Sequence, residues 1–148
     1  MTDIRFYHMT RKTLERALPE LLVKALERYP RILVKTADAD QAAALDTLLW
    51  TYEAGSFMPH SHVLNEFAGE QPVFITAEDL NPNDARMIVL TGGATSATVA
   101  DFELCCELFD GNDDAAVQAA RARWAVYKEA GHMLTYFQQD DDGRWVRK

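Results

Sequence analysis

Apolar residues recur along this chain with two different periods, and stretches of the two kinds alternate. Continuous runs of apolar, branched and aromatic residues predict strands at 4–9, 31–36, 72–76 and 87–91. Leucine and alanine at helical spacing predict three helices, from Thr10 or Thr13 to Tyr29, over 41–52 and over 115–131. The run at 102–109 fits a strand or a helix, and we favour a strand because the turn sequence Asp110-Gly111-Asn112 ends it.

The order of these elements predicts the fold class. The predicted order is strand, helix, strand and helix, followed by strands apolar enough to be covered on both sides. This order predicts an α/β protein. We expect a Rossmann-like, mostly parallel sheet with helices on both faces. This pattern predicts an architecture only, because one fold hosts many functions.

Three stretches interrupt the pattern. Pro19 falls within the first predicted helix, so that helix either kinks there or begins there. Residues 53–71 show no sustained period and include two glycines and a proline, which predicts a long loop. After the last helix the chain becomes polar, with the acidic run Asp140-Asp141-Asp142. We therefore divide the chain into a single domain over 1–138 and a polar, candidate flexible tail over 139–148.

Composition and cysteine usage indicate an ordinary globular protein of the cytoplasm. The chain has 148 residues, and no apolar run approaches the roughly 18–20 residues that a membrane span needs. Its N-terminus lacks the features of a secretory signal. The two cysteines, Cys105 and Cys106, are adjacent, and neighbouring cysteines rarely form a disulfide. We therefore expect a reducing, cytoplasmic location and no membrane association.

Charge is segregated along the chain, whose formal net charge is −8. Residues 11–35 carry seven Lys or Arg against three Glu, whereas residues 36–113 carry one Arg against fourteen Asp or Glu. An acidic chain is a poor general ligand for nucleic acid. Direct DNA binding by the basic first helix is nevertheless one alternative, against which the acidic middle of the chain argues.

Motifs for catalysis and for bound groups give no positive signal. The sequence has neither GxxxxGK[ST] nor GxGxxG, and Gly92-Gly93 reads best as a turn. His60 and His62 form an H-x-H pair without an HExxH or a cysteine pair to support a metal site. We therefore expect no catalytic residue, metal or cofactor. The alternative is a nucleotide-binding Rossmann-like enzyme of unknown substrate.

The last predicted helix carries an unusual stripe. Val117, Arg121, Trp124 and Lys128 fall on one narrow line, while alanines with Val126 and Tyr127 form a broader face elsewhere. If the broader face docks on the core, Trp124 lies outside between two cations. That arrangement suits a ligand that is anionic and has an apolar tip, such as an acidic peptide ending in an aromatic residue.

Large aromatics also lie at and after the end of the second predicted helix, among them Trp50 and Phe57. From the residues alone, such side chains either fill the core under a loop, which we favour, or present a protein-binding patch.

Three groups of residues, in this order and spacing, give a family resemblance. They are Phe6-Tyr7, Leu49-Trp50 followed by Phe57-Met58-Pro59-His60, and the C-terminal set Arg121, Arg123, Trp124, Tyr127, Lys128, Ala130 and Gly131. With them the chain resembles the chi subunit of bacterial DNA polymerase III holoenzyme, from the first strand to the end of the last helix.

The resemblance implies an accessory, non-catalytic subunit with a Rossmann-like sheet. Chi proteins bind the acidic C-terminal tail of the single-strand DNA-binding protein, which ends in Asp-Asp-(Ile/Leu)-Pro-Phe. Through a partner called psi they join the clamp loader. DNA is then reached indirectly, through the single-strand-binding protein.

The resemblance also implies a set of site residues. The positions that match the tail-binding residues are Arg121 and Trp124, with Lys128 on the same stripe. Two family lysines fall on Val117 and Ala125 here, which weakens the attraction for the tail and gives other cations, such as Arg123, a larger part.

The psi-binding Trp and Phe of the family match Trp50 and Phe57. Some bacterial lineages have no recognisable psi, so these two residues serve psi, another clamp-loader partner or the core.

Overall fold

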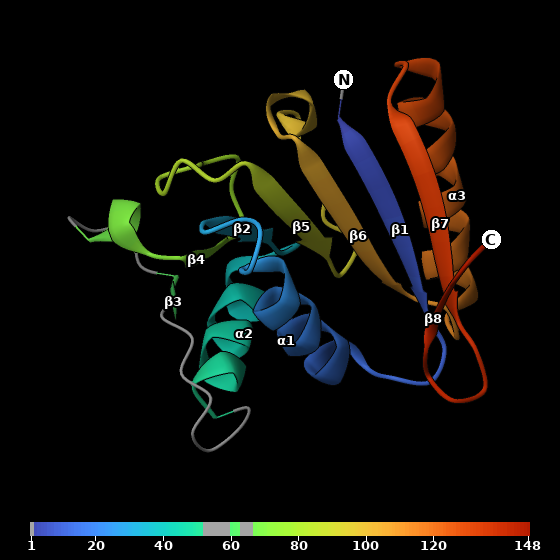
Figure 1. Ribbon diagram of the computed structural model, residues 1–148, viewed down its shortest axis with the longest axis horizontal. Coiled ribbons are helices and arrows are strands. Elements are labelled where there is room, and N and C mark those ends of the chain that lie inside the picture. Colours follow the sequence, from blue (N-terminus) through green and yellow to red (C-terminus); the bar gives the residue numbers. More distant parts are fainter. Residues whose placement is uncertain (1, 52–59, 63–66) are drawn as a thin grey trace.

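The computed structural model describes residues 2–51, 60–62 and 67–148, and its centre is one open sheet (Figure 1). The strand order is β3-β4-β2-β5-β6-β1-β7-β8. Every described pair is parallel except β7 with β8, which is antiparallel. The strands are β1 Asp3–Met9, β2 Ile32–Lys35, β3 His60–Ser61, β4 Val73–Thr76, β5 Met87–Thr91, β6 Leu104–Asp110, β7 Met133–Gln139 and β8 Trp145–Arg147.

The helices lie on both faces of this sheet. They are α1 Leu14–Ala25, α2 Ala39–Thr51 and α3 Asp114–Glu129. The core under α1 and α2 takes Tyr7 and Met9 from β1, whereas the core under α3 takes Ile4 and Phe6 from the same strand. Side chains alternate between the faces of a strand, so β1 contributes to both cores. The predicted α/β fold, mostly parallel with helices on both faces, is confirmed, while its Rossmann-like detail stays a prediction.

The predicted elements agree with the structure to within a few residues. The ambiguous run at 102–109 is a strand, β6. The first helix begins after Thr13 and ends at Ala25, four residues before the predicted end. Pro19 lies buried inside α1, so the helix does not begin at this proline. None of the described helices is long and apolar enough to cross a bilayer.

Three described strands, β3, β7 and β8, were not predicted from the sequence, and β3 lies within the predicted long loop at 53–71. β7 extends the parallel sheet beside β1. An acidic turn then reverses the chain, with the Asp140 carboxylate accepting hydrogen bonds from the backbone N–H groups of Asp142 and Arg144. β8 follows and pairs with the end of β7. The segment at 139–148 that the sequence analysis treated as a tail therefore contributes a strand to the sheet.

The two cysteines lie side by side on β6 but face opposite cores. Cys105 is fully buried under α3, and Cys106 is 1% exposed under α1 and α2. Burial raises the pKa of both thiols, that of Cys106 to about 12. Thiolates, rather than thiols, react with alkylating agents.

We therefore expect neither thiol to react with iodoacetamide at pH 8 in the folded protein. Both should react within minutes in denaturant, as mass spectrometry of the intact protein would show. Modification of the folded protein at the rate of the denatured protein would contradict this burial.

Candidate functional site

Helix α3 has strong local reasons to form. The Asp113 carboxylate caps its N-terminus by accepting hydrogen bonds from the backbone N–H groups of Ala115 and Ala116. Asp114 lies in the first turn and Lys128 in the last, each on the side that the helix dipole favours. Alanine and arginine, which are strong helix formers, fill much of the interior.

The helix docks on the sheet by a different face from the one predicted. Ala120 is buried and Tyr127 packs on the core as expected, but Val126 is 65% exposed. Val117 and Trp124 pack against the core instead. The prediction that Trp124 lies on the outer side is thus wrong: its indole is half-buried. An indole offers far more apolar area than a valine, and the helix turns it toward the sheet.

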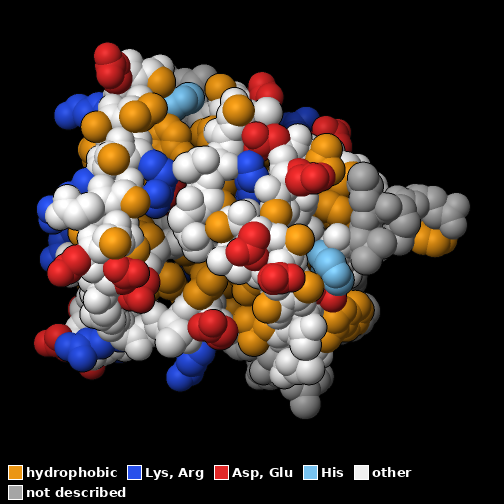
Figure 2. Space-filling model, turned by 180° about the vertical axis from the view of Figure 1, so that it is seen from behind, with side chains coloured by type: hydrophobic (Ala, Val, Ile, Leu, Met, Phe, Trp, Pro, Cys, Tyr) orange, Lys and Arg blue, Asp and Glu red, His pale blue; other side chains and the backbone are white. Residues whose placement is uncertain are grey.

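This orientation leaves a small apolar pocket between α3 and the strands beneath it. The cavity has a volume of about 200 Å³ and is lined by Phe6, Phe109, Val117, Ala120, Arg121, Trp124 and Tyr136. Its most buried members are Phe6, Phe109 and Ala120, and the exposed Arg121 lies at its mouth. Seen from behind, the half of the molecule that carries α3 shows hydrophobic side chains at the surface beside Lys and Arg (Figure 2).

Edge-to-face contacts hold the aromatic rings of this pocket in place. The Trp124 ring lies 5.3 Å from Phe6 and 5.9 Å from Tyr136, centroid to centroid, at interplanar angles of 67° and 71°. Phe6 in turn meets Phe109 edge-on at 6.3 Å. Sites for cofactors and drug-sized ligands are larger, about 300–1,000 Å³. A cavity of this size with aromatic sides suits a single apolar or aromatic side chain.

The mouth of the pocket is polar and positively charged. Burial raises the pKa of the Tyr136 hydroxyl, and the charge of the neighbouring Arg121 acts in the opposite sense. The same hydroxyl is hydrogen-bonded to Nδ1 of His8. Lys128, also exposed, lies further along the helix, on the stripe that carries Arg121 and Trp124. Chemically, the arrangement fits an apolar group whose neighbouring atoms are anionic.

Arg123 has a different environment from the other two cations of α3. Its Nε lies 2.5 Å from Oε1 of Glu107 on β6, and the two side chains are 14% and 2% exposed. Burial raises the pKa of Glu107, and the charge of Arg123 opposes that rise. This ion pair ties α3 to the sheet, so a ligand would compete with Glu107 for Arg123.

The second predicted patch lies away from α3. Trp50, near the end of α2, is 54% exposed and its ring lies 4.3 Å from the ring of His60. The core interpretation therefore does not hold for Trp50. Phe57 lies outside the described residues. Helix α2 covers the opposite face of the sheet from α3, so Trp50 is well separated from the pocket beside α3 (Figure 1).

His60 and His62 are oriented by an acidic neighbour. His60 Nε2 lies 2.9 Å from the backbone oxygen of Asp46, and His62 Nδ1 lies 3.3 Å from its carboxylate. In the described part of the chain, no group of three or more His, Cys, Asp or Glu side chains is arranged to hold a metal ion.

Sequence reasoning identified Arg121 and Trp124 but missed Phe109, Tyr136 and His8 as neighbours of the pocket. These residues lie on three different strands, and only the assembled sheet brings them together. Their aromatic character was a signal for burial, but no local spacing connects them to α3.

Comparison with known proteins places this chain in a family. The family model described as "DNA polymerase III chi subunit, HolC" matches residues 1–135. The chain is 28% identical over 120 residues to DNA polymerase III subunit chi of Escherichia coli strain K12, covering 81% of this chain and 82% of that one. It is 29% identical over 114 residues to the chi subunit of Pseudomonas aeruginosa, covering 77% and 78%.

A third relative is the probable DNA polymerase III subunit chi of Rickettsia prowazekii strain Madrid E. It is 27% identical over 109 residues, which cover 74% of this chain and 66% of that protein. Because the family model spans nearly the whole chain, the protein belongs to the DNA polymerase III chi subunit family.

Proposed function

We propose that this protein is an accessory, non-catalytic subunit of the replicative DNA polymerase III holoenzyme. It binds the acidic C-terminal tail of the single-strand DNA-binding protein at the pocket beside α3 and links that protein to the clamp loader during replication. The observation that carries the proposal is an apolar pocket of single-side-chain size with Arg121 at its mouth.

The chemistry of the tail is complementary to this pocket. Its terminal Phe ring enters the cavity against Phe6 and Trp124, where edge-to-face contacts with further rings are favourable. Its terminal carboxylate or the neighbouring Asp meets Arg121, and an upstream Asp meets Lys128. Arg123 adds positive charge nearby, but its ion pair with Glu107 partly neutralises that charge.

The expected affinity is moderate. A charge-assisted hydrogen bond contributes about 1.5–3 kcal/mol and an exposed ion pair less. Together with burial of one aromatic ring, these terms give a Kd on the micromolar scale, which corresponds to about 8 kcal/mol. Several tails on one coated strand raise the effective concentration, so weak single contacts suffice for tethering. Weak, salt-sensitive contacts also release readily as the replication fork moves.

One departure from the family pattern supports apolar rather than charged recognition at the pocket. Val117 stands where the family has a lysine, and its side chain lines the cavity. It adds apolar area against the tail's terminal ring and removes one cation. With no cation at Val117 or Ala125, the electrostatic attraction for the tail comes mainly from Arg121 and Lys128.

The clamp-loader partner, psi or another subunit, binds the surface that includes Trp50 and Phe57. The exposure of Trp50 on the face opposite α3 supports this part of the proposal. With the two surfaces on opposite faces, the tail and the clamp-loader partner bind at the same time.

A fluorescence anisotropy titration tests the tail site directly. The probe is a labelled acidic peptide ending in Asp-Asp-Leu-Pro-Phe, titrated at low and at high salt. We expect micromolar binding that weakens with salt, falls about tenfold or more in Arg121→Ala, and is lost in Trp124→Ala.

Arg147→Ala is the matched control, because Arg147 is an exposed arginine on β8 outside the pocket. Thermal unfolding of each variant separates loss of the site from loss of the fold. Absence of wild-type binding at low salt, or equal binding in the Arg121 and Arg147 variants, would refute the tail site.

A further inference from the structure

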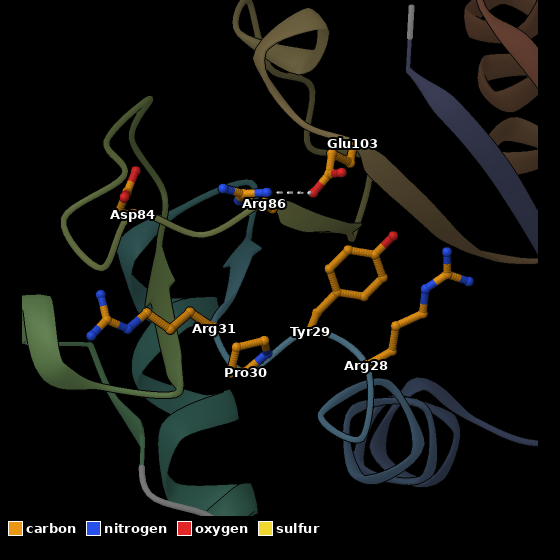
Figure 3. Close-up of a pocket in the computed structure, with 7 residues that line it drawn as sticks. All are labelled: Arg28, Tyr29, Pro30, Arg31, Asp84, Arg86 and Glu103. Atoms are coloured by element: carbon orange, nitrogen blue, oxygen red, sulfur yellow. Dashed lines mark ion pairs between the residues drawn. The ribbon is translucent and has the colours of Figure 1, made fainter.

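A second cavity lies at the edge of the sheet where three adjacent parallel strands begin (Figure 3). Its volume is about 490 Å³, and its lining residues are Arg28, Tyr29, Pro30, Arg31, Asp84, Arg86 and Glu103. Arg31, Arg86 and Glu103 each immediately precede a strand, β2, β5 and β6 respectively. The first residues of these strands are in register, which brings the three side chains to one edge.

The fold gathers arginines here that are far apart in the sequence. Arg86 is the one Lys or Arg of residues 36–113, a stretch with fourteen Asp or Glu, and it joins Arg28 and Arg31. Its Nη1 lies 3.6 Å from Oε2 of Glu103, and the two side chains are 78% and 58% exposed. An ion pair this long and this exposed holds Arg86 only weakly.

Tyr29 supplies an aromatic surface between the arginines. Its ring is half-buried, and the Arg28 guanidinium lies 5.6 Å from the ring centroid. Arg28 and Arg31 lie on opposite sides of Tyr29 and Pro30, and the Tyr29 ring lies between Arg28 and the Arg86–Glu103 pair (Figure 3). The cations are therefore spread along the cavity, which fits an extended polyanion better than a single compact anion.

We propose that this cavity binds a short segment of single-stranded nucleic acid. The guanidinium groups of Arg28, Arg31 and Arg86 contact successive phosphates, and a base stacks on Tyr29. Guanidinium groups match phosphate geometry, and sequence-tolerant single-strand sites combine cations with an aromatic platform. The volume lies within the usual range for ligand sites, about 300–1,000 Å³.

Tyr29 and the two carboxylates of the cavity together favour a nucleic acid over an acidic peptide. Asp84 and Glu103 repel any anion, but a carboxylate can also accept a hydrogen bond from a base amino group such as cytosine N4. An acidic peptide can also offer its backbone N–H groups to the carboxylates, but its acidic residues have no ring to stack on Tyr29. Because the cavity is separate from the pocket beside α3, the proposal is independent of tail binding.

The test uses the full chain with a fluorescent single-stranded oligodeoxycytidine and no single-strand-binding protein. We expect weak binding at low salt, with a slope of log K against log salt of about −1.4 to −2.1 for two or three phosphates. Arg28→Ala and Arg31→Ala should each reduce the affinity at least about fivefold and make the slope shallower by about 0.7. Tyr29→Leu keeps the apolar bulk but removes the stacking surface, so it should also reduce the affinity about fivefold or more.

The control variants are of two kinds: two that should leave the affinity unchanged and one that should raise it. Arg16→Ala should bind the oligonucleotide like the wild type, because Arg16 is an exposed arginine of α1 outside the cavity. Arg121→Ala should do the same, because Arg121 lines the other pocket. Glu103→Gln frees Arg86 and removes a negative charge, so it should bind about two- to fivefold more tightly.

The proposal is overturned if the wild type does not bind at low salt, or if Arg28→Ala and Arg31→Ala match Arg16→Ala. It is also overturned if a poly-glutamate peptide competes as well as the unlabelled oligonucleotide does. That outcome would assign the cavity to acidic peptides instead.

Discussion

Replacing Phe6 by alanine is expected to lower the free energy of unfolding by about 3–5 kcal/mol, the largest effect we predict for a single side chain. Phe6 is fully buried at the centre of β1 and meets Phe109, Trp124 and Tyr127 edge-on. Its removal loses the favourable transfer of a whole ring from water and leaves a cavity. The surrounding rings cannot easily collapse into this cavity, because β6 and α3 hold them in place. Urea unfolding followed by circular dichroism measures the effect.

The matched control is Val126→Ala on α3. Val126 is 65% exposed, so its truncation should change stability by no more than about 0.5 kcal/mol. Phe6→Ala should also weaken binding of the acidic peptide, because Trp124 loses the ring that it packs against. If Phe6→Ala unfolds at the same urea concentration as Val126→Ala, the packing of α3 on β1 is not as described.

The main elements could be predicted because their sequences are locally consistent. The runs at 72–76 and 87–91 are apolar without interruption, as expected of strands covered on both faces, and they form β4 and β5. β7 was missed although residues 133–137 are mostly apolar, because polar glutamines and an acidic run follow them at once. β8 has only three residues, and it exists because the Asp140 turn folds it back onto β7.

The sequence predicted the spacing of the site residues along α3, but not the side of the helix that packs on the sheet. A helical wheel gives the angles between Arg121, Trp124 and their neighbours, so their shared stripe could be read from the sequence. It does not say which face meets the sheet. That choice depends on the apolar area that each face buries, and the indole outweighed the small side chains. The second cavity could not be predicted at all, because strand register alone brings Arg86 beside Arg31.

Replacing Trp145 by alanine is expected to destabilise the protein by about 2 kcal/mol, less than for a fully buried Trp because its side chain is only half-buried. Trp145 meets Tyr7 edge-on at 5.0 Å, and Tyr7 stacks on Phe137 at 5.1 Å. All three rings belong to the core on the face of the sheet that carries α1 and α2, or pack against it. These two helices do not extend over β7 (Figure 1).

Urea unfolding of Trp145→Ala against Val146→Ala isolates this contribution within one strand. Val146 is 39% exposed and, as the next residue of β8, points to the opposite side, so its truncation should change stability by about 0.5 kcal/mol or less. A larger loss for Trp145→Ala means that the C-terminal strand is part of the folded domain and stabilises it through Tyr7. Equal stability of the two variants would mean that residues 139–148 behave as an independent tail, and that Tyr7 and Phe137 hold this face of the sheet without them.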